Sequence, residues 1–162
     1  MREALRPLIS LWILAVDGFG LYFCNNGEDQ TAKSVVFIFE TGELWSVDTL
    51  ALGNRKRVFP FLEEYFVHRF KDYSAFLNFL GLQSPYRWVC GITGTKGYQL
   101  QMATGAGQVS IWDLPNCVSN SILADGLYDE VKVPARALLP FFDLIFNKCG
   151  VARPAHLELK GQ

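Results

Sequence analysis

The chain has 162 residues, of which 50% are hydrophobic and 14% are aromatic, so it has ample material for a buried core. Such a composition excludes an intrinsically disordered chain. The 15 basic and 16 acidic residues nearly cancel, which leaves no overall field to attract nucleic acid or an anionic membrane. We therefore expect a single globular domain over residues 1–162.

The N-terminal segment is apolar over residues 8–16 and follows two arginines, as in a secretory signal. Pro7 and a glutamate interrupt its basic region, and Asp17-Gly18-Phe19-Gly20 makes a poor cleavage site. The apolar run is also shorter than the roughly 18 residues that a membrane span requires. We predict a short core helix over residues 7–16, with proline in its first turn.

The next part of the chain has the composition of a β-sheet. Residues 21–24 predict a short strand, and residues 34–40 and 43–48 predict a hairpin, because β-branched and aromatic residues flank a glycine-containing turn. Alternation along the second strand of the hairpin places Trp45 and Val47 on one face. We expect this face to be the buried one.

Residues 58–80 change to a helical period. Pro60 suits the first turn of a helix, and Gly81 suits its C-terminal stop. The apolar stripe is typical of a core-facing surface rather than of a cofactor site, and we expect His68, which lies off the stripe, at the surface. The stripe consists of Phe59, Leu62, Phe66, Phe70, Tyr73, Leu77 and Leu80.

The C-terminal third of the chain predicts strands over residues 109–112 and 128–133, followed by a second long helix. Apolar residues recur at helical spacing over residues 135–149. Pro140 either kinks this helix or marks its true start, and Gly150 ends it.

The central stretch, residues 86–100, predicts a strand, a tight glycine turn and a return strand. Residues 87–92 have the bulky apolar character of a strand with a buried face, and Gly94 and Gly97 permit a sharp turn before residues 98–102. Together the predicted elements indicate an α+β fold. We expect a mostly antiparallel twisted sheet with two long helices packed against it and a short N-terminal helix.

The candidate ligand site is the glycine turn, which reads Gly-Ile-Thr-Gly-Thr-Lys-Gly over residues 91–97. A Walker loop needs serine or threonine after its lysine and then a helix, whereas Lys96 is followed by glycine and a predicted strand. Backbone amides could still form an anion nest here. A structural turn is therefore the main interpretation, and nucleotide or phosphate binding is the alternative. Its candidate ligand-binding residues are Arg87, Gly91, Gly94, Thr95, Lys96 and Gly97.

The only dense basic patch consists of Arg55, Lys56 and Arg57, in a loop before the first long helix. These side chains could contact the phosphate backbone of nucleic acid, although three cations in a loop are more commonly solvated surface. The Gly105-Ala106-Gly107 loop lacks the third glycine of a dinucleotide-binding fingerprint. Any nucleic-acid contact would therefore come through the basic patch.

The four cysteines form neither a CxxC pair nor a zinc-like spacing with His68 or His156. Cys90 and Cys149 lie in apolar runs, which favours buried free thiols over a disulfide framework, a metal site or redox chemistry. Cys117, in a polar segment, looks like the most exposed thiol, but no spacing pairs it with a histidine for nucleophilic catalysis. We expect no catalytic residue, no metal and no cofactor, and a cytoplasmic protein.

Three segments of the chain together resemble a known family. Residues 43–48, 86–100 and 139–154 are similar to the C-terminal region of bacterial Schlafen-like proteins, which carry an AlbA-type DNA-binding or ATP-binding domain upstream. The acidic and lysine motif of that upstream domain is absent from this sequence. The resemblance therefore implies an accessory module.

Two functions remain open. The first is a non-catalytic accessory, sensor or interaction domain of a larger cytoplasmic, nucleic-acid-associated regulatory protein. Its partner would be the upstream domain of the same polypeptide or another protein, without membrane contact. The early entry of the chain into the core fits the C-terminal module of a longer protein. The second is a small-molecule or nucleotide-binding domain with enzymatic capacity, centred on the turn from Gly91 to Gly97.

Overall fold

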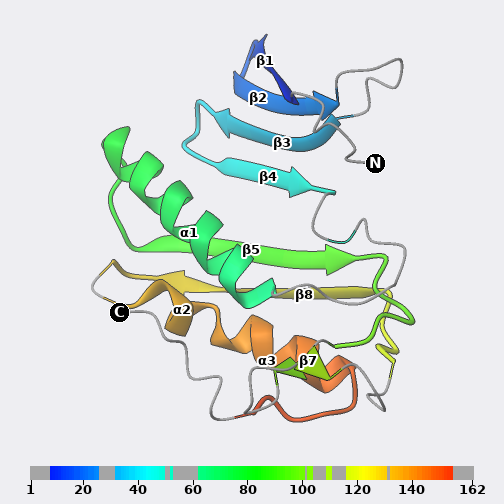
Figure 1. Cartoon of the computed structure of the whole chain (residues 1–162). Coiled ribbons are helices and arrows are strands. Elements are labelled where there is room, and N and C mark those ends of the chain that lie inside the picture. Colours follow the sequence, from blue (N-terminus) through cyan, green and yellow to red (C-terminus); the bar gives the residue numbers. More distant parts are fainter. Residues whose placement is uncertain are drawn as a thin grey trace. The chain divides into compact units, whose positions relative to one another are not determined.

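The structure is a computed structural model that describes residues 8–25, 32–49, 52, 62–100, 102–103, 109–110, 116–130 and 132–154. Its contacts divide the chain into two compact units, Met1–Gly53 and Asn54–Gln162. Each unit is described by itself (Figure 1). The expectation of a single domain stays a prediction.

The first unit is an antiparallel meander of four strands in the order β1-β2-β3-β4. The strands are β1 (Leu8–Ala15), β2 (Gly18–Asn25), β3 (Ala32–Phe39) and β4 (Leu44–Asp48). They confirm the predicted strand at residues 21–24 and the hairpin that follows. Neighbouring strands pair along nearly their whole length.

The predicted N-terminal helix is wrong, because residues 8–15 form strand β1. A short apolar run fits a buried helix and a strand equally well by periodicity alone. The decisive feature lies further along the chain, where β2 returns beside β1 with Ala15 opposite Gly18. The tight turn between the two strands commits the apolar run to the sheet.

The expected burial of Trp45 and Val47 is also wrong, since these side chains are 63% and 62% exposed. The hairpin pairing is as predicted, since Trp45 pairs with Phe37 across the ladder and its ring meets Phe39 edge-on at 5.9 Å. Alternation separates two faces of a strand but does not say which face is covered. Within the described part of this unit, no helix covers the sheet.

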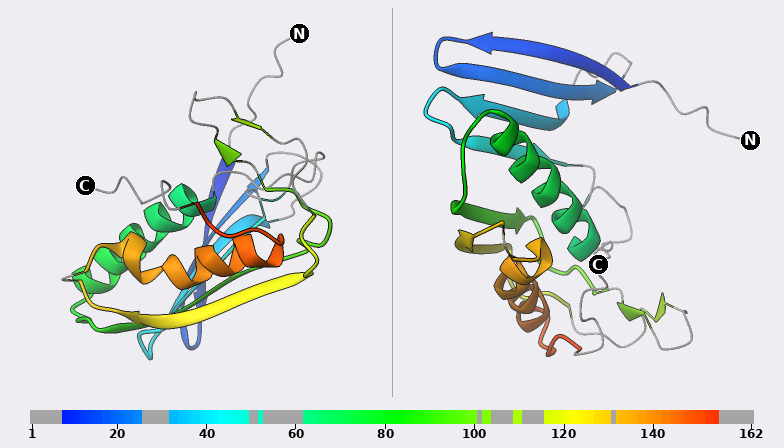
Figure 2. Two further views of the ribbon diagram at one scale, coloured as in Figure 1. Left: turned by 90° about the horizontal axis from the view of Figure 1, so that it is seen from below. Right: turned by 90° about the vertical axis from the view of Figure 1, so that its left-hand side faces the viewer.

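In its described residues the second unit combines antiparallel strands with three helices, which confirms the α+β class. Strands β5 (Tyr86–Thr93) and β8 (Ser121–Tyr128) pair along their full length. Strands β6 (Met102–Ala103) and β7 (Val109–Ser110) form a second, short pair. The helices α1 (Leu62–Phe79), α2 (Pro134–Ala137) and α3 (Leu139–Lys148) lie on one side of β5 and β8 (Figure 2).

Two predicted strands are wrong, and both errors concern the partner of β5. The expected return strand at residues 98–102 does not pair with β5, and Gln99 makes only an isolated bridge to Asn116. The partner is β8, which lies earlier in the chain than the predicted strand at residues 128–133. Asp129 instead begins a turn, because its carbonyl oxygen accepts a hydrogen bond from the Lys132 amide at 2.8 Å.

Both long helices end as predicted, at glycines in the left-handed region. Gly81 has a φ of 83° and Gly150 a φ of 76°. After α1, the amides of Gly81 and Leu82 donate to the carbonyls of Asn78 and Leu77. The same two bonds follow α3, so each end is a Schellman motif.

The second helical region divides in two, which confirms one of the two predicted roles of Pro140. Helix α2 ends at Ala137, and α3 starts after Leu138 with Pro140 in its first turn. Proline has no amide to donate, so it fits this position. The break brings Phe141, Phe142 and other apolar side chains of α3 into the core.

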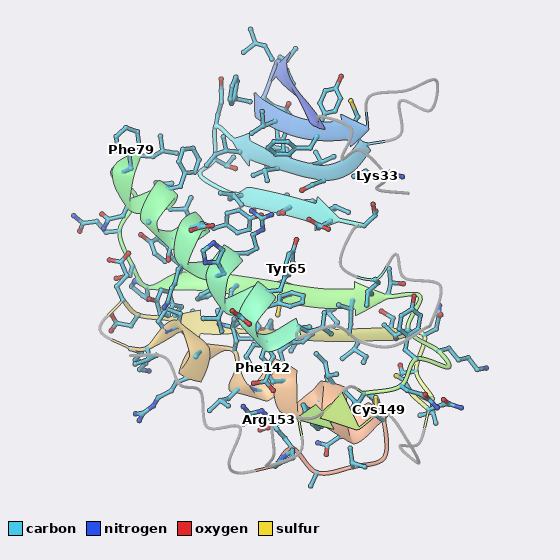
Figure 3. All side chains as sticks on the ribbon, viewed as in Figure 1. Lys33, Tyr65, Phe79, Phe142, Cys149 and Arg153 are labelled. Atoms are coloured by element: carbon cyan, nitrogen blue, oxygen red, sulfur yellow. The ribbon has the colours of Figure 1, made fainter. Side chains whose placement is uncertain are left out.

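The core of the second unit is built from aromatic contacts between α1, α3 and the inner face of β5 and β8. The Phe70 ring on α1 lies 6.3 Å from Trp88 and 4.9 Å from Tyr128. Phe66, one turn earlier, lies 4.8 Å from Phe141 on α3. These contacts confirm the predicted core-facing stripe for Phe66 and Phe70. Leu80, at the end of the stripe, is 46% exposed, contrary to the prediction, and Phe59 lies outside the described residues. Figure 3 draws the side chains of the described residues.

An ion pair ties the end of the described chain to the start of α1. Arg153 donates from Nε and Nη2 to the two carboxylate oxygens of Glu63, at 2.8 Å and 2.7 Å. The Arg153 side chain is nearly buried, and the Glu63 side chain is mostly covered. Such a two-pronged contact fixes both side chains more firmly than a single bond would.

Replacing Arg153 with alanine should therefore lower the free energy of unfolding by about 3 kcal/mol, because Glu63 would be left partly buried without its cation. Urea unfolding measures this change. Arg136→Ala, an exposed arginine on α2, is the matched control and should change stability little. In a double-mutant cycle, Arg153→Ala and Glu63→Gln should be strongly non-additive. Equal costs for the two arginines would contradict the assignment.

Candidate functional site

The glycine turn after β5 is held by the backbone of residues 117–120. The amides of Gly94 and Thr95 donate to the Asn120 carbonyl at 2.8 Å and 3.4 Å, and the Gly97 amide donates to the Cys117 carbonyl at 2.9 Å. Gly94 and Gly97 have φ values of 76° and 83°. These conformations favour glycine, as the sequence predicts.

Thr95 anchors the turn with its side chain. It is completely buried, and its hydroxyl donates to the Ser119 carbonyl at 2.8 Å. Its own carbonyl accepts a hydrogen bond from the Tyr98 amide at 2.9 Å. A threonine at this position therefore fastens the turn to the neighbouring segment instead of facing solvent.

These hydrogen bonds argue against an anion nest in the turn, because a nest requires backbone amides that are free to bind the anion. The amides of Gly94, Thr95, Gly97 and Tyr98 all donate to carbonyl oxygens of the chain. Lys96 is exposed, but a lysine alone does not make a phosphate cradle. The turn as described has the geometry of a structural corner.

The structure does not bring all of the candidate ligand-binding residues together. Arg87 and Gly91 lie on β5, and a strand rises about 3.3 Å per residue, so Arg87 is roughly 20 Å from Gly94. Arg87 instead lies 3.9 Å from Asp125 on β8. Arg55, Lys56 and Arg57 lie outside the described residues, as do His156 and the loop at residues 104–108.

The prediction that Cys117 is the most exposed thiol is wrong, because only 1% of this residue is accessible. Its amide donates to the Tyr98 carbonyl at 2.8 Å, and its carbonyl accepts from Gly97. The backbone carbonyls of this polar segment hold the corner, and the Cys117 thiol donates to the Ser119 carbonyl at 3.4 Å. Cys149 is buried as predicted, and Cys90 is partly buried.

Burial suppresses ionisation of two thiols. It raises the pKa of Cys90 to about 12. It also raises the pKa of Cys149 to about 12, together with the charge of Cys117 and a hydrogen bond to that side chain. Because the thiolate is the nucleophile, neither cysteine has the environment of a catalytic thiol. His68 lies at the surface as predicted, 3.6 Å from Asp72.

The sheet face opposite the helices carries the most distinctive surface of the second unit. We call it the outer β5–β8 face. Val89, Leu123 and Leu127 are 61%, 65% and 67% exposed on it. The Arg87–Asp125 pair lies among them, since Arg87 is opposite Leu127 and Val89 is opposite Asp125. The sequence interpretation missed this face because it missed β8. Burial alternates along residues 121–128 in the structure, but the residue types do not, because Leu123 and Leu127 are apolar and exposed.

The first unit has a hollow of about 260 Å³ at the end of β1, β2 and β3. Its lining is mainly apolar, and Glu40 is the one charged residue among the lining side chains. A specific ligand site combines an apolar cavity with several convergent polar groups. This hollow lacks that combination.

The described residues contain no group of three or more histidine, cysteine, aspartate or glutamate side chains that could hold a metal ion. None of the helices in the described parts of the chain has the length and apolar content that a membrane crossing requires. Comparison with family models, with curated proteins and with solved structures finds no match to this chain.

Thr95→Val should lower the free energy of unfolding by about 1–2 kcal/mol, because the variant keeps the shape of the side chain but removes the hydrogen bond to the Ser119 carbonyl. Chemical denaturation measures the loss. Thr93→Val, at the exposed end of β5, is the control and should be nearly neutral. A neutral Thr95→Val would mean that the hydroxyl does not anchor the turn.

The buried thiols predict a loss of stability at alkaline pH. Cys90 has an ordinary pKa of 9.0 and a pKa of about 12 in the folded protein. The stabilising contribution of the neutral Cys90 thiol to the free energy of unfolding is therefore complete below pH 9.0. It is lost as the pH rises towards 12, because the unfolded chain releases the proton first. In this range the free energy of unfolding of Cys90→Ala should fall less steeply than that of the unaltered protein. Parallel pH profiles would show that the thiol ionises equally in both states.

Proposed function

We propose that this chain is a non-catalytic interaction domain that binds a protein partner through the outer β5–β8 face. The observation that carries the proposal is the exposure of Val89, Leu123 and Leu127 around the Arg87–Asp125 pair. Three large aliphatic side chains on one open sheet face are typical of a docking surface. The partner surface that fits has an apolar centre with an acidic and a basic group placed opposite Arg87 and Asp125.

The energetics of this face favour association over a purely structural role. Each aliphatic side chain contributes about 1–2 kcal/mol when the rest of its surface is removed from water, because about a third of it is already covered. The Arg87–Asp125 pair is largely solvated and 3.9 Å apart, so an exchange of partners costs little. Association also costs several kcal/mol in lost freedom of motion. The face therefore suits a regulated contact or the centre of a larger interface.

The same face explains why an interaction role fits better than an enzyme. Its charged groups are one cation and one anion that already compensate each other, and its other polar side chains are the hydroxyls of Thr93 and Ser121 at one end. The glycine turn uses its amides internally. Chemistry at either place would need groups that are poised for a reaction and free of such internal bonds.

The resemblance to the C-terminal region of bacterial Schlafen-like proteins supports the wider setting of the proposal. In that setting the chain is an accessory or sensor module of a larger cytoplasmic regulatory protein associated with nucleic acid. An upstream AlbA-type domain is then one candidate partner for the outer face. Direct contact with nucleic acid would be made by Arg55, Lys56 and Arg57.

A photo-crosslinking amino acid at position 123, in the protein expressed in its native host, tests the proposal. We expect one defined protein adduct, identified by mass spectrometry, and no such adduct from the control position 64, which is exposed on α1. The purified partner should bind the unaltered protein, and Leu127→Asp should weaken binding at least about tenfold, because a charge would be buried in the apolar centre. Glu64→Ala should leave the affinity unchanged.

The alternative proposal, nucleotide binding at the turn from Gly91 to Gly97, is tested with the same preparations. It predicts heat on titration with ATP that is reduced in Lys96→Ala, whereas the interaction domain predicts no heat with either protein.

Identical adducts at positions 64 and 123, or a Leu127→Asp variant with full affinity, would overturn the assignment of the outer face.

A further inference from the structure

Two of the four cysteines lie together in the core of the second unit. Cys117 is in the segment that holds the glycine turn, and Cys149 directly follows α3. Their accessibilities are 1% and 0%. Cys117 is one of the neighbouring groups that raise the pKa of Cys149, so the two side chains are close enough to influence each other. The Cys117 thiol donates to the Ser119 carbonyl at 3.4 Å. Figure 3 marks Cys149 at the end of α3.

The backbone beside the two thiols is joined as well. The Val118 amide donates to the Lys148 carbonyl at 3.0 Å, and these residues are the immediate neighbours of Cys117 and Cys149. This bond joins the peptide group that Cys117 shares with Val118 to the peptide group that Lys148 shares with Cys149. A disulfide needs Cα atoms roughly 4.4–6.8 Å apart. The backbone bond and the burial of both residues therefore place the two cysteines side by side.

We propose that Cys117 and Cys149 form a reversible disulfide that latches the glycine-turn corner to the end of α3. The oxidant is a low-molecular-weight disulfide such as oxidised glutathione. The corner is the right place for such a latch, because the carbonyls of Cys117, Ser119 and Asn120 accept the bonds that hold Gly94, Thr95 and Gly97. The disulfide would thus join the end of α3 to residues 117–120 and, through their carbonyls, to the glycine turn.

The reaction proceeds by two exchanges. One cysteine loses its proton, and its thiolate attacks a sulfur of oxidised glutathione, which forms a mixed disulfide and releases one glutathione thiolate. The second cysteine loses its proton and attacks the protein sulfur of the mixed disulfide, which releases the second glutathione. The protein loses two protons and two electrons in total, and these appear in two molecules of reduced glutathione.

The surroundings of the pair determine when the latch closes. Burial raises the pKa of Cys149 to about 12, so little thiolate is present at neutral pH. Both residues are also inaccessible to oxidised glutathione while the corner is closed. The two thiols therefore stay reduced in a reducing compartment. The disulfide forms when the corner opens locally and exposes them, or when the pH rises. Cys24 lies in the other unit and Cys90 lies on β5, so they serve as internal controls.

The test uses the unaltered protein in oxidised glutathione at about pH 8.5, near the ordinary thiol pKa. After quenching, alkylation and digestion, we expect a peptide linked between Cys117 and Cys149, with Cys24 and Cys90 alkylated, and an intact mass lower by two hydrogen atoms. In the Cys24→Ala/Cys90→Ala variant, oxidation should raise the melting temperature by roughly 5–15 °C, and dithiothreitol should reverse the shift. Further substitution of Cys117→Ala should abolish it.

Two outcomes would overturn the proposal. In the first, the folded protein keeps four alkylatable thiols under conditions that oxidise the same chain in denaturant, or links other cysteines in preference. In the second, the disulfide forms without a change in melting temperature, which would show that it does not stabilise the corner. Because the peptide mapping uses the unaltered sequence, the first outcome is decisive even if a variant fails to fold.

Discussion

The packing of Phe70 between Trp88 and Tyr128 is the contact on which the second unit depends. Its ring lies 6.3 Å and 4.9 Å from theirs, and it joins α1 to both strands of the β5–β8 pair. A two-stranded sheet is not stable alone in water and needs a covering layer. The helices supply that layer on one face only, and the open face is a direct result. The candidate docking surface is therefore the reverse side of the core.

The glycine turn has the residue composition of an anion-binding loop but a structural role in the fold. Its glycines are required by positive φ values, and its amides are satisfied by the segment that leads into β8. Thr95 and Cys117 are buried at this corner because the two segments cover each other. The residue types that suggest an anion site here fasten the turn after β5 to the segment that leads into β8.

Local signals in the sequence were sufficient for the ends of the two long helices and for the β3–β4 hairpin, and insufficient for the N-terminal segment and for the partner of β5. Pro140, Gly81 and Gly150 act within one turn of their position, so the helix ends could be predicted. The partner of β5 depends on residues far along the chain, and Gly126 in β8 reads as a strand breaker although it lies under the ring of Trp88. Which face of β4 is covered likewise depends on elements that alternation does not encode.

The Arg153–Glu63 pair has a consequence for the connectivity of the second unit. It places the two ends of the unit's described region beside each other, since Glu63 stands in the first turn of α1 and Arg153 follows α3. Domains whose ends meet tolerate circular permutation. The unit could therefore be closed into a ring by a short peptide and reopened at the exposed turn near Lys132, with the order of its elements rearranged and its core retained.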